Sequence, residues 1–185
     1  MRRLALAAAL VLLGSGPAAA QVPKADPWLA RTTATDFDLQ RGPDTPARIA
    51  VPRKDWMVLP TGRSVLFVMA ARKGDAVVMV ERTPLSLPLE PDDVTEVLAQ
   101  IQIDTIKSRE TRASDFEPRV IDAGERRLVA VQYKRPGALG AERVRQYSLP
   151  IGKWLYHITC AASANQFASY EPLFAHIAGS FAASE

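Results

Sequence analysis

The sequence predicts an α/β (α+β) domain, a single three-layer α/β/α sandwich built on one mostly antiparallel, twisted sheet. Three observations lead to this fold class. Runs rich in β-forming residues are separated by short turns that contain glycine or proline, which indicates antiparallel strands. Two further segments show the apolar spacing of helices. Several strand segments are apolar at both odd and even positions, so we expect helices over both faces of the sheet.

The first twenty residues predict export. Arg2 and Arg3 precede the apolar run 4–13, and the small residues 18–20 end the segment. This is the layout of a signal peptide cleaved before Gln21. The apolar run is too short to cross a bilayer, which takes roughly 20 residues. We therefore expect a soluble periplasmic protein that is not an integral membrane protein, with full secretion as the alternative.

Charge and cysteine content exclude some classes of protein. Without the signal peptide the chain has 21 basic and 20 acidic side chains, since Arg2 and Arg3 leave with it. A net charge of +1 lacks the clustered basic excess of nucleic-acid-binding proteins, so we expect no nucleic-acid partner. Cys160 is the only cysteine, so the chain cannot form an intramolecular disulfide. About 165 residues suffice for one domain with its own core.

Residues 21–46 predict a flexible N-terminal arm. They are rich in proline, threonine, aspartate and alanine and show little periodicity. We expect Trp28 or Phe37 to pin this arm to the domain, which is expected to span residues 47–185.

The domain is expected to contain a hairpin and a meander. The expected strands lie at 48–52, 56–59, 64–71, 76–82, 118–122, 126–134, 142–149 and 154–161. Gly74 lies in the turn between the third and fourth of these, which is typical of a hairpin. Short turns with glycine or proline separate the last four, which predicts an antiparallel meander.

Two amphipathic helices are expected, at 92–107 and 165–181. Pro91 and the two acids after it favour the start of the first helix, because acidic groups stabilise the positive end of a helix dipole. Its expected buried face consists of Val94, Val97, Leu98 and Ile101. The expected buried stripe of the second helix consists of Phe167, Tyr170, Phe174, Ile177 and Phe181. Pro172 falls inside the second helix and is expected to kink or restart it.

The order of elements and the end of the chain resemble the PsbP-like family. Asp55–Trp56 follows the short strand that ends at Val51–Pro52, and the strand residues 158–161 precede the terminal-helix residues 174–181. The family includes the extrinsic photosystem II subunit and bacterial envelope proteins such as the DcrB-like group. The resemblance covers roughly residues 48–181 and implies an α/β/α sandwich with a non-enzymatic accessory role. It transfers no catalytic motif or cofactor, and the chain's two histidines do not match the family's metal ligands.

Candidate catalytic and metal-binding residues do not converge in the sequence. Cys160 and His157 are three residues apart on a predicted strand, so their side chains are expected on opposite faces and outside hydrogen-bond reach. His176 is expected at the boundary of the last helix, and the two histidines lack the short spacing of metal ligands. The acids at the start of the first helix are explained by the helix dipole. We expect no catalytic residue, no cofactor and no metal.

The expected strand register predicts a polar groove on one face of the sheet. A four-residue turn at 150–153 would place Gln146 opposite His157, and a turn centred near Leu139 would place Gln132 beside Gln146. The three side chains would then line up across three strands. The same face would carry Ser148 and Thr159.

The opposite face is expected to form an aromatic core. It would carry Tyr133, Tyr147, Tyr156 and Trp154. The alternative is a half-exposed sheet face with ordinary polar residues, and a one-residue slip in register would scatter the set.

The meander also carries a local excess of basic side chains. These are Arg126, Arg127, Lys134, Arg135, Arg143 and Arg145. They predict a docking surface for an acidic partner or an anionic headgroup. The alternative is a row of solvated strand edges.

The sequence favours an exported, non-enzymatic accessory protein that binds another envelope protein through the sheet face or the basic meander. The residues expected to contribute are Gln132, Gln146, His157, Arg143 and Arg145. One alternative is a protein that binds a small ligand or a lipid headgroup, and transient contact with a membrane surface is compatible with it. A hydrolase with a serine, a histidine and an aspartate assembled from distant positions is the third candidate.

Overall fold

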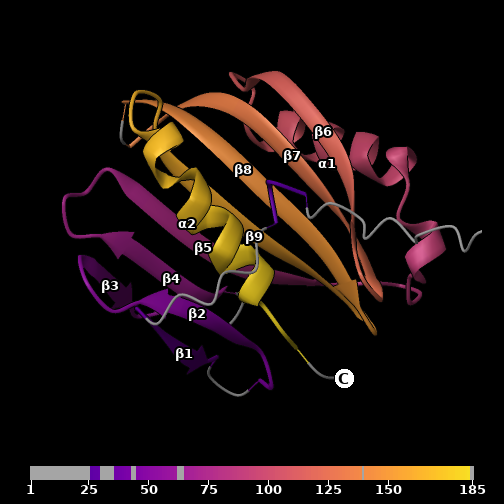
Figure 1. Ribbon diagram of the computed structural model, residues 1–185. Helices are drawn as coiled ribbons and strands as arrows, with labels where there is room; N and C mark the ends of the chain where they lie inside the picture. The colour runs from indigo at the N-terminus through magenta and orange to yellow at the C-terminus, as the bar shows by residue number, and fades with distance from the viewer. Residues whose placement is uncertain (1–25, 30–35, 43–44, 62–64, 139, 184–185) are drawn as a thin grey trace, which may run out of the picture.

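Figure 1 shows the computed structural model of the protein, in which a twisted sheet lies between two helices. The structure describes residues 26–29, 36–42, 45–61, 65–138 and 140–183. The predicted signal peptide, residues 1–20, lies outside the described residues.

Seven strands form one antiparallel sheet in the spatial order β3-β4-β5-β9-β8-β7-β6. The strands are β3 (Trp56–Leu59), β4 (Val65–Ala71), β5 (Ala76–Pro84), β6 (Ser114–Ala123), β7 (Arg126–Gly137), β8 (Gly140–Ile151) and β9 (Trp154–Ser163). The predicted hairpin and the predicted meander are confirmed. The last strand of the meander pairs with β5, so hairpin and meander join into a single sheet.

A separate two-stranded sheet precedes the large one. It pairs β1 (Phe37–Arg41) with β2 (Arg48–Pro52). Strand β1 therefore lies within the segment that we expected to be a flexible arm, and the expected domain boundary at residue 46 falls inside this hairpin. Trp28 is only 6 % exposed and packs in the main core, so the described part of the segment is not a loose arm. It is ordered because its aromatic side chains contact the domain, as expected for Trp28 and Phe37.

Helix α2 (Phe167–Ser180) packs against one face of the sheet beside the β1–β2 hairpin (Figure 1). Phe167, Phe174 and Ile177 of its predicted stripe are fully buried in the main core. The helix runs through Pro172. The hairpin contributes Ile49 and Val51 to the same core, so this face of the sheet is covered by a helix and a hairpin together.

Helix α1 (Glu96–Arg109) packs against β6 and β7 on the other face, after a 3-10 turn η1 (Pro91–Asp93) at the predicted helix start. Its predicted buried face is wrong for two of the four residues. Val97 is 69 % exposed and Ile101 is 52 % exposed. The residues that α1 buries are Ala99, Gln102, Ile103 and Ile106. The helix thus turns the polar side chain of Gln102 toward the sheet. Apolar spacing in the sequence cannot reveal a buried polar residue.

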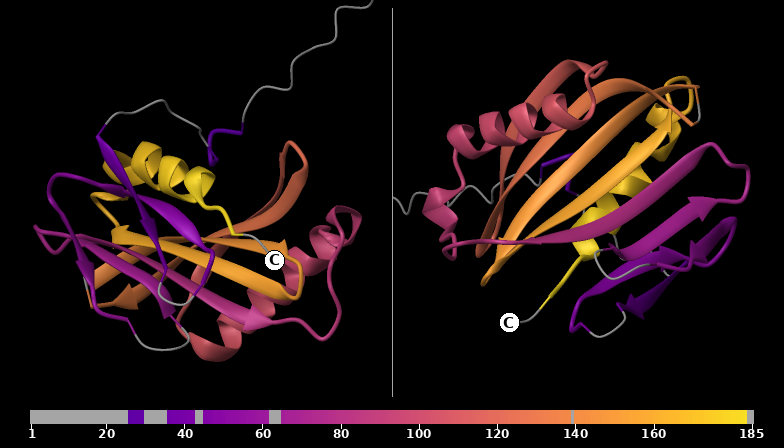
Figure 2. Two further views of the ribbon diagram at one scale, coloured as in Figure 1. Left: turned by 90° about the horizontal axis from the view of Figure 1, so that it is seen from below. Right: turned by 180° about the vertical axis from the view of Figure 1, so that it is seen from behind.

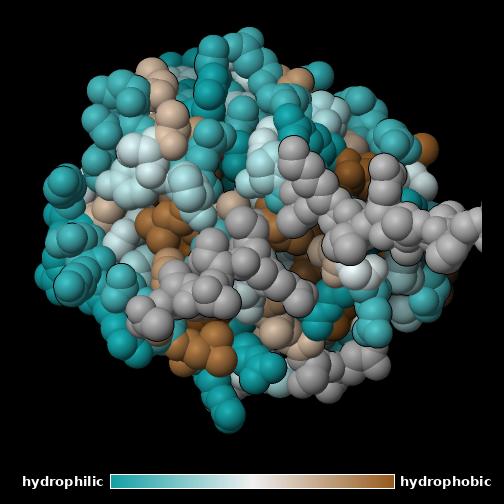
Figure 3. All heavy atoms as spheres, in the orientation of Figure 1, coloured by the Kyte–Doolittle hydropathy of each residue, from teal (hydrophilic) through white to brown (hydrophobic). Residues whose placement is uncertain are grey.

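The predicted three-layer arrangement is confirmed, with unequal cover on the two faces. Figure 2 shows from behind that α1 lies over the β6–β8 part of the sheet and that β9, β5 and β4 continue beyond it. On the α2 side, which Figure 3 shows, hydrophilic residues surround hydrophobic residues that reach the surface near the centre. We call the two sides of the sheet the α1 face and the α2 face.

Replacing Trp28 with alanine should destabilise the whole domain. The side chain is buried in the main core, and truncating such an aromatic residue costs about 3–5 kcal/mol of the free energy of unfolding. Urea unfolding of the Trp28→Ala variant measures the loss. Leu87→Ala, at a residue that is 76 % exposed, is the control and should change stability by less than about 0.5 kcal/mol. Equal stability of the two variants would contradict the anchoring role of Trp28.

Candidate functional site

Four polar side chains of β8 and β9 share the α1 face, as the sequence predicted. Ser148 is paired with His157, and Gln146 is paired with Thr159. The expected pairing of Gln146 with His157 is wrong by two positions, because Ile151 pairs directly with Trp154 across a two-residue turn. Side chains alternate with a period of two along a strand, so a shift of two leaves all four residues on the expected face.

Gln132 does not join this group. It is paired with Arg145 and not with Gln146, a shift of one position from the expected register. A shift of one moves a side chain to the opposite face, so Gln132 lies on the α2 face. The same shift places Tyr133 on the α1 face, where it stacks on Phe116 with ring centroids 5.6 Å apart. Both parts of the groove hypothesis that depended on this strand pair are therefore wrong.

His157 is held by two side chains of β8 in a pocket of about 230 Å³ beside α1. Its Nδ1 lies 3.0 Å from the Ser148 hydroxyl and 3.4 Å from the Gln146 side-chain nitrogen. Ser148 in turn donates a hydrogen bond of 3.2 Å to Oε1 of Gln102 on α1. Residues of three elements therefore meet at one point, and we call this hollow the α1 pocket.

Nδ1 of His157 is engaged by both side chains of β8. The Ser148 hydroxyl gives its proton to the Gln102 carbonyl oxygen, and the Gln146 side-chain nitrogen can only donate. The other ring nitrogen, Nε2, forms no hydrogen bond with a described residue, and His157 lines the pocket.

The environment keeps His157 neutral. Burial, together with the smaller effect of the positive charge of Arg109, lowers the pKa of its imidazole from 6.5 to about 4. A neutral imidazole at neutral pH offers one donor and one acceptor, so it suits an uncharged polar group better than an anion.

The C-terminal end of α1 adds charged groups to the pocket. Arg135 donates to Glu110 at 2.5 Å and to Glu142 at 2.8 Å. Tyr133 donates to the same Glu110 oxygen, Oε1, at 3.4 Å. The second oxygen, Glu110 Oε2, is buried and lacks a hydrogen-bond partner among the described residues. An unsatisfied buried carboxylate oxygen is costly, so Glu110 is held here by its other oxygen, Oε1, which accepts from Arg135 and Tyr133.

Two further charges at the pocket have no ion-pair partner within the described chain. Arg109 and Glu81 both line the pocket, and neither takes part in a salt bridge there. A second hollow of about 430 Å³ shares Arg109, Glu110 and Arg135 with the α1 pocket. The pocket therefore contains both hydrogen-bond donors, such as Arg109, and hydrogen-bond acceptors, such as Glu81.

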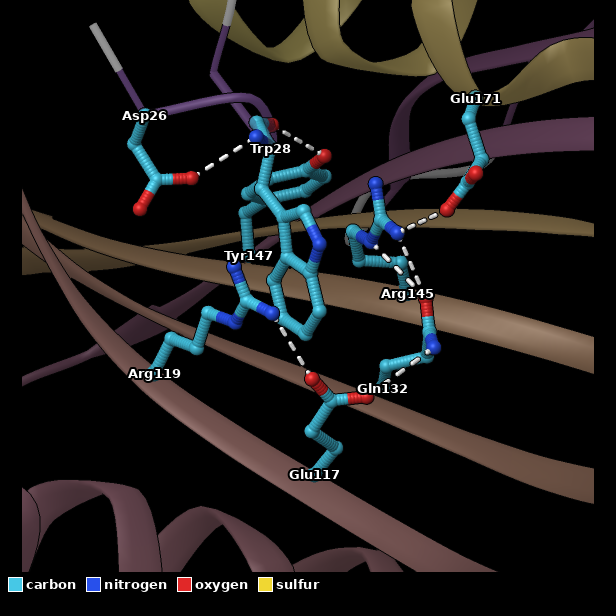
Figure 4. Close-up of polar contacts among 8 residues, drawn as sticks. All are labelled: Asp26, Trp28, Glu117, Arg119, Gln132, Arg145, Tyr147 and Glu171. Atoms are coloured by element: carbon cyan, nitrogen blue, oxygen red, sulfur yellow. Dashed lines mark hydrogen bonds and ion pairs between the residues drawn. The ribbon is translucent and has the colours of Figure 1, made fainter. Parts of the chain in front are cut away.

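The α2 face carries a different cluster, built around Trp28 (Figure 4). The indole lies between two guanidinium groups, with Arg119 at 3.9 Å and Arg145 at 4.1 Å from the ring centroid. Tyr147 donates its hydroxyl proton to the Trp28 carbonyl oxygen at 2.6 Å. Arg145 also donates to Gln132 at 2.6 Å and to Glu171 of α2 at 2.5 Å. Cation–π contacts and charge-assisted hydrogen bonds together fix the N-terminal segment to the sheet.

Arg145 is therefore a buried structural residue, only 1 % exposed, and not a surface residue as predicted. Most other basic side chains of the meander have acidic partners. The salt bridges are Arg127–Asp122 at 2.6 Å, Lys134–Asp115 at 2.7 Å, and those of Arg135. Arg143 is half-buried and lies 5.8 Å from the Phe167 ring centroid. The meander thus presents much less free positive charge than its sequence indicates.

Sequence reasoning missed Gln102, Arg109 and Glu110. Gln102 and Arg109 are seven residues apart and share one side of α1 with Ile106, which is a helical repeat that mixes polar and apolar residues. A search that accepted polar members of the repeat could have found them. Nothing local marks Glu110, because its partners are more than twenty residues away in sequence.

Other expected features of the chain can be placed directly. Cys160 is fully buried on the α2 face, opposite to His157 as predicted, and burial raises the pKa of its thiol. His176 of α2 lies against Phe37, with ring centroids 4.2 Å apart. Within the residues that the structure describes, no group of three or more histidine, cysteine, aspartate or glutamate side chains could hold a metal ion. No helix among those residues is long and apolar enough to cross a membrane.

Replacing Arg145 with methionine should destabilise the fold by about 2–3 kcal/mol, because Gln132 would lose its buried partner and Trp28 one of its two cations. Arg143→Met is the matched control and should cost less than about 0.5 kcal/mol. Chemical denaturation of both variants compares them. If the two variants were equally stable, Arg145 would not have the structural role described here.

His157 should make stability depend on pH between about 4 and 6.5. In this range the unfolded chain binds a proton that the folded state does not, so the free energy of unfolding should fall as the pH falls from 6.5 toward 4. A His157→Asn variant should show a smaller slope in denaturation at several pH values. Burial also lowers the pKa of His176, so part of the slope should persist until His176→Asn is added. An unchanged slope in the double variant would contradict the burial of both histidines.

Comparisons with solved structures agree with this geometry at the level of the fold. The chain is similar to CyanoP, the cyanobacterial PsbP of Synechocystis sp. PCC 6803, with a TM-score of 0.59, 13 % identity, and coverage of 83 % of this chain and 96 % of that one. It is also similar to LpqN of Mycobacterium tuberculosis, a protein involved in cell envelope biogenesis, with a TM-score of 0.50, 12 % identity, and coverage of 80 % and 92 %.

Sequence comparison identifies no relative: no protein-family model matches the chain, and no curated protein matches it. At this low identity the structural likeness concerns the fold alone. It confirms the resemblance that the order of elements indicated: the chain has the PsbP fold.

Proposed function

We propose that this chain is an exported, non-enzymatic accessory protein of the cell envelope that acts by binding a small polar ligand in the α1 pocket. One observation carries the proposal. Polar groups from β5, from β9 and from the end of α1 converge on this pocket, and the Glu81 carboxylate, His157 Nε2 and the Arg109 guanidinium have no ion-pair or hydrogen-bond partners among the described residues. Pockets with a few convergent polar groups are the usual form of a small-molecule site.

The mixture of groups indicates the kind of ligand. Arg109 and Gln146 can donate hydrogen bonds, Glu81 and Glu110 can accept them, and Nε2 of the neutral His157 ring donates or accepts according to the tautomer. A fully anionic ligand would meet two carboxylates, and a cationic one would meet Arg109. Hydroxyl groups both donate and accept, so a small hydroxyl-bearing ligand fits the pocket best.

Turnover is disfavoured by the placement of the serine. Ser148 and His157 form a contact of 3.0 Å, which is the type of pair a hydrolase needs. The Ser148 side chain, however, is only 1 % exposed and lies beneath Gln102, so its hydroxyl cannot reach a substrate in the pocket. A binding role therefore accounts for the geometry better than nucleophilic catalysis does.

Export to the envelope rests on the N-terminal sequence. Arg2 and Arg3, the apolar run and the small residues before Gln21 form the layout of a signal peptide. The likeness to LpqN, a protein involved in envelope biogenesis, is compatible with a periplasmic location.

An envelope protein as partner is the second candidate, favoured by the exposed edge strand β3. Met57, Val58 and Leu59 are each more than a third exposed, and within the described part of the chain β3 pairs only with β4. An edge strand of this kind can accept a strand from another protein. The charge pairing within the meander makes the strand edge a better docking point than the basic residues.

The binding role can be tested with 1-monoacetylglycerol, a small hydroxyl-bearing probe that also contains an ester. We expect millimolar binding that shifts the backbone amide signals of Gln146, His157 and Arg109 in two-dimensional NMR spectra. These shifts should disappear in a Gln146→Leu/His157→Leu variant, because the variant removes two polar groups of the pocket.

The control is Lys134→Gln, which changes an exposed salt bridge outside the pocket and should leave the shifts intact. Acetate released from the probe would show hydrolysis and would contradict a non-enzymatic role. A wild-type protein whose amide signals do not move would contradict binding of this ligand class.

A further inference from the structure

Among the described residues, no helix covers the part of the α1 face that β3, β4 and β5 form. Helix α1 covers β6 and β7, and the view from behind in Figure 2 shows the other strands continuing beyond its edge. On β3, β4 and β5, six side chains that point to the α1 face are apolar and at least partly exposed. They are Met57, Leu59, Val68, Ala70, Val77 and Met79, and we call them the open apolar face. The polar residues of β5 on this face, Glu81 and Thr83, line the pocket.

The open apolar face leads directly into the α1 pocket. Cross-strand pairing places Leu59 beside Val68 and Val68 beside Met79. Met79 is then paired with Thr159, and Thr159 with Gln146. One row of neighbouring side chains therefore runs from an apolar edge to the polar pocket. From β3 to β5 it spans two strand spacings, about 10 Å.

Helix α1 borders this surface at the pocket. Gln102, Thr105 and Arg109 of α1 line the pocket together with Met79 of β5. Met79 therefore belongs both to the open apolar face and to the α1 pocket.

We propose that the open apolar face holds the alkyl chain of a single amphiphile whose polar head occupies the α1 pocket. This inference rests on the proposed function, since it extends the ligand of the same site. The head would contact Arg109, His157 and Gln146. The chain would follow the row from Met79 to Val68 and Leu59.

An amphiphile fits this surface better than a partner helix or a second copy of the chain does. Either protein partner would cover the apolar residues, but it would also have to satisfy His157 Nε2 and the charges of Glu81 and Arg109 at the pocket. In a molecule with a hydroxyl-bearing head and one alkyl chain, the head can form hydrogen bonds in the α1 pocket. The chain attached to it can cover the open apolar face next to the pocket. Burial of apolar surface would then add to the affinity of the head.

Two monoacylglycerols that share one head test the inference. We expect monomeric 1-monodecanoylglycerol to bind at least about tenfold more tightly than 1-monoacetylglycerol, because the added methylene groups leave water. A Leu59→Gln/Val68→Thr variant should lose this gain and still bind the acetyl compound. Isothermal titration and amide chemical shifts measure both affinities.

The matched control is Leu39→Gln/Val58→Thr. Leu39 lies on β1, and Val58 is the neighbour of Leu59 that points to the other side of β3, so the same chemical changes are made outside the open apolar face. This variant should keep the tenfold gain. Retained binding of the acetyl compound in every variant shows that pocket and fold are intact.

The remaining outcomes separate the two proposals. Equal affinities of the two compounds for the wild-type protein would overturn the chain-binding role and leave the polar pocket standing. Failure of both compounds to bind would refute the proposed function itself. Dimers in ultracentrifugation that Leu59→Gln/Val68→Thr dissolves would assign the open apolar face to a second copy. Binding only to vesicles or micelles would assign it to a membrane surface, and either result would overturn the inference.

Discussion

The rest of the structure follows from one constraint: a sheet that is apolar on both faces needs cover on both faces. This chain supplies unequal cover. Helix α2 and the β1–β2 hairpin together bury the α2 face, where Ile49, Phe174 and Ile158 meet in one core. The α1 face receives a single helix over β6 and β7. The α1 pocket lies at the margin of that helix, where buried core gives way to open sheet.

The position of each polar side chain depends on strand register, and this determines how far the sequence could predict the site. Composition and turn residues were enough to predict the strands and their order in the meander. They did not define the length of each turn. On β8 and β9 the error was two positions, which kept Gln146 and His157 on one face. On β7 and β8 it was one position, which moved Gln132 to the other face. A register error of two positions therefore left the predicted residues on one face, whereas an error of one position removed Gln132 from the predicted site.

Two other errors have a tertiary cause. The apolar spacing of the first helix includes Val97 and Ile101, which are exposed because α1 packs on the sheet through Ala99, Gln102, Ile103 and Ile106 instead. Arg145 lies in a run of basic strand residues that is typical of a solvated surface. It is buried because Trp28, more than a hundred residues earlier in the chain, packs on its guanidinium group and Glu171 of α2 balances its charge. No local pattern contains these partners.

The placement of Gln102 links the fold to a binding role. A helix that only stabilised the sheet would turn Ile101 inward and Gln102 outward, since buried apolar contacts stabilise more than a buried amide does. Helix α1 does the reverse, and Gln102 is accommodated because Ser148 donates to it. The contacts of Ser148 and Gln146 with Nδ1 orient the His157 ring so that Nε2 is left for the pocket. The same rotation of the helix leaves Ile101 exposed. The open apolar face reaches the pocket through Met79, which is paired with Thr159 and lines the pocket, and this is why we treat the polar and the apolar part as a single binding surface.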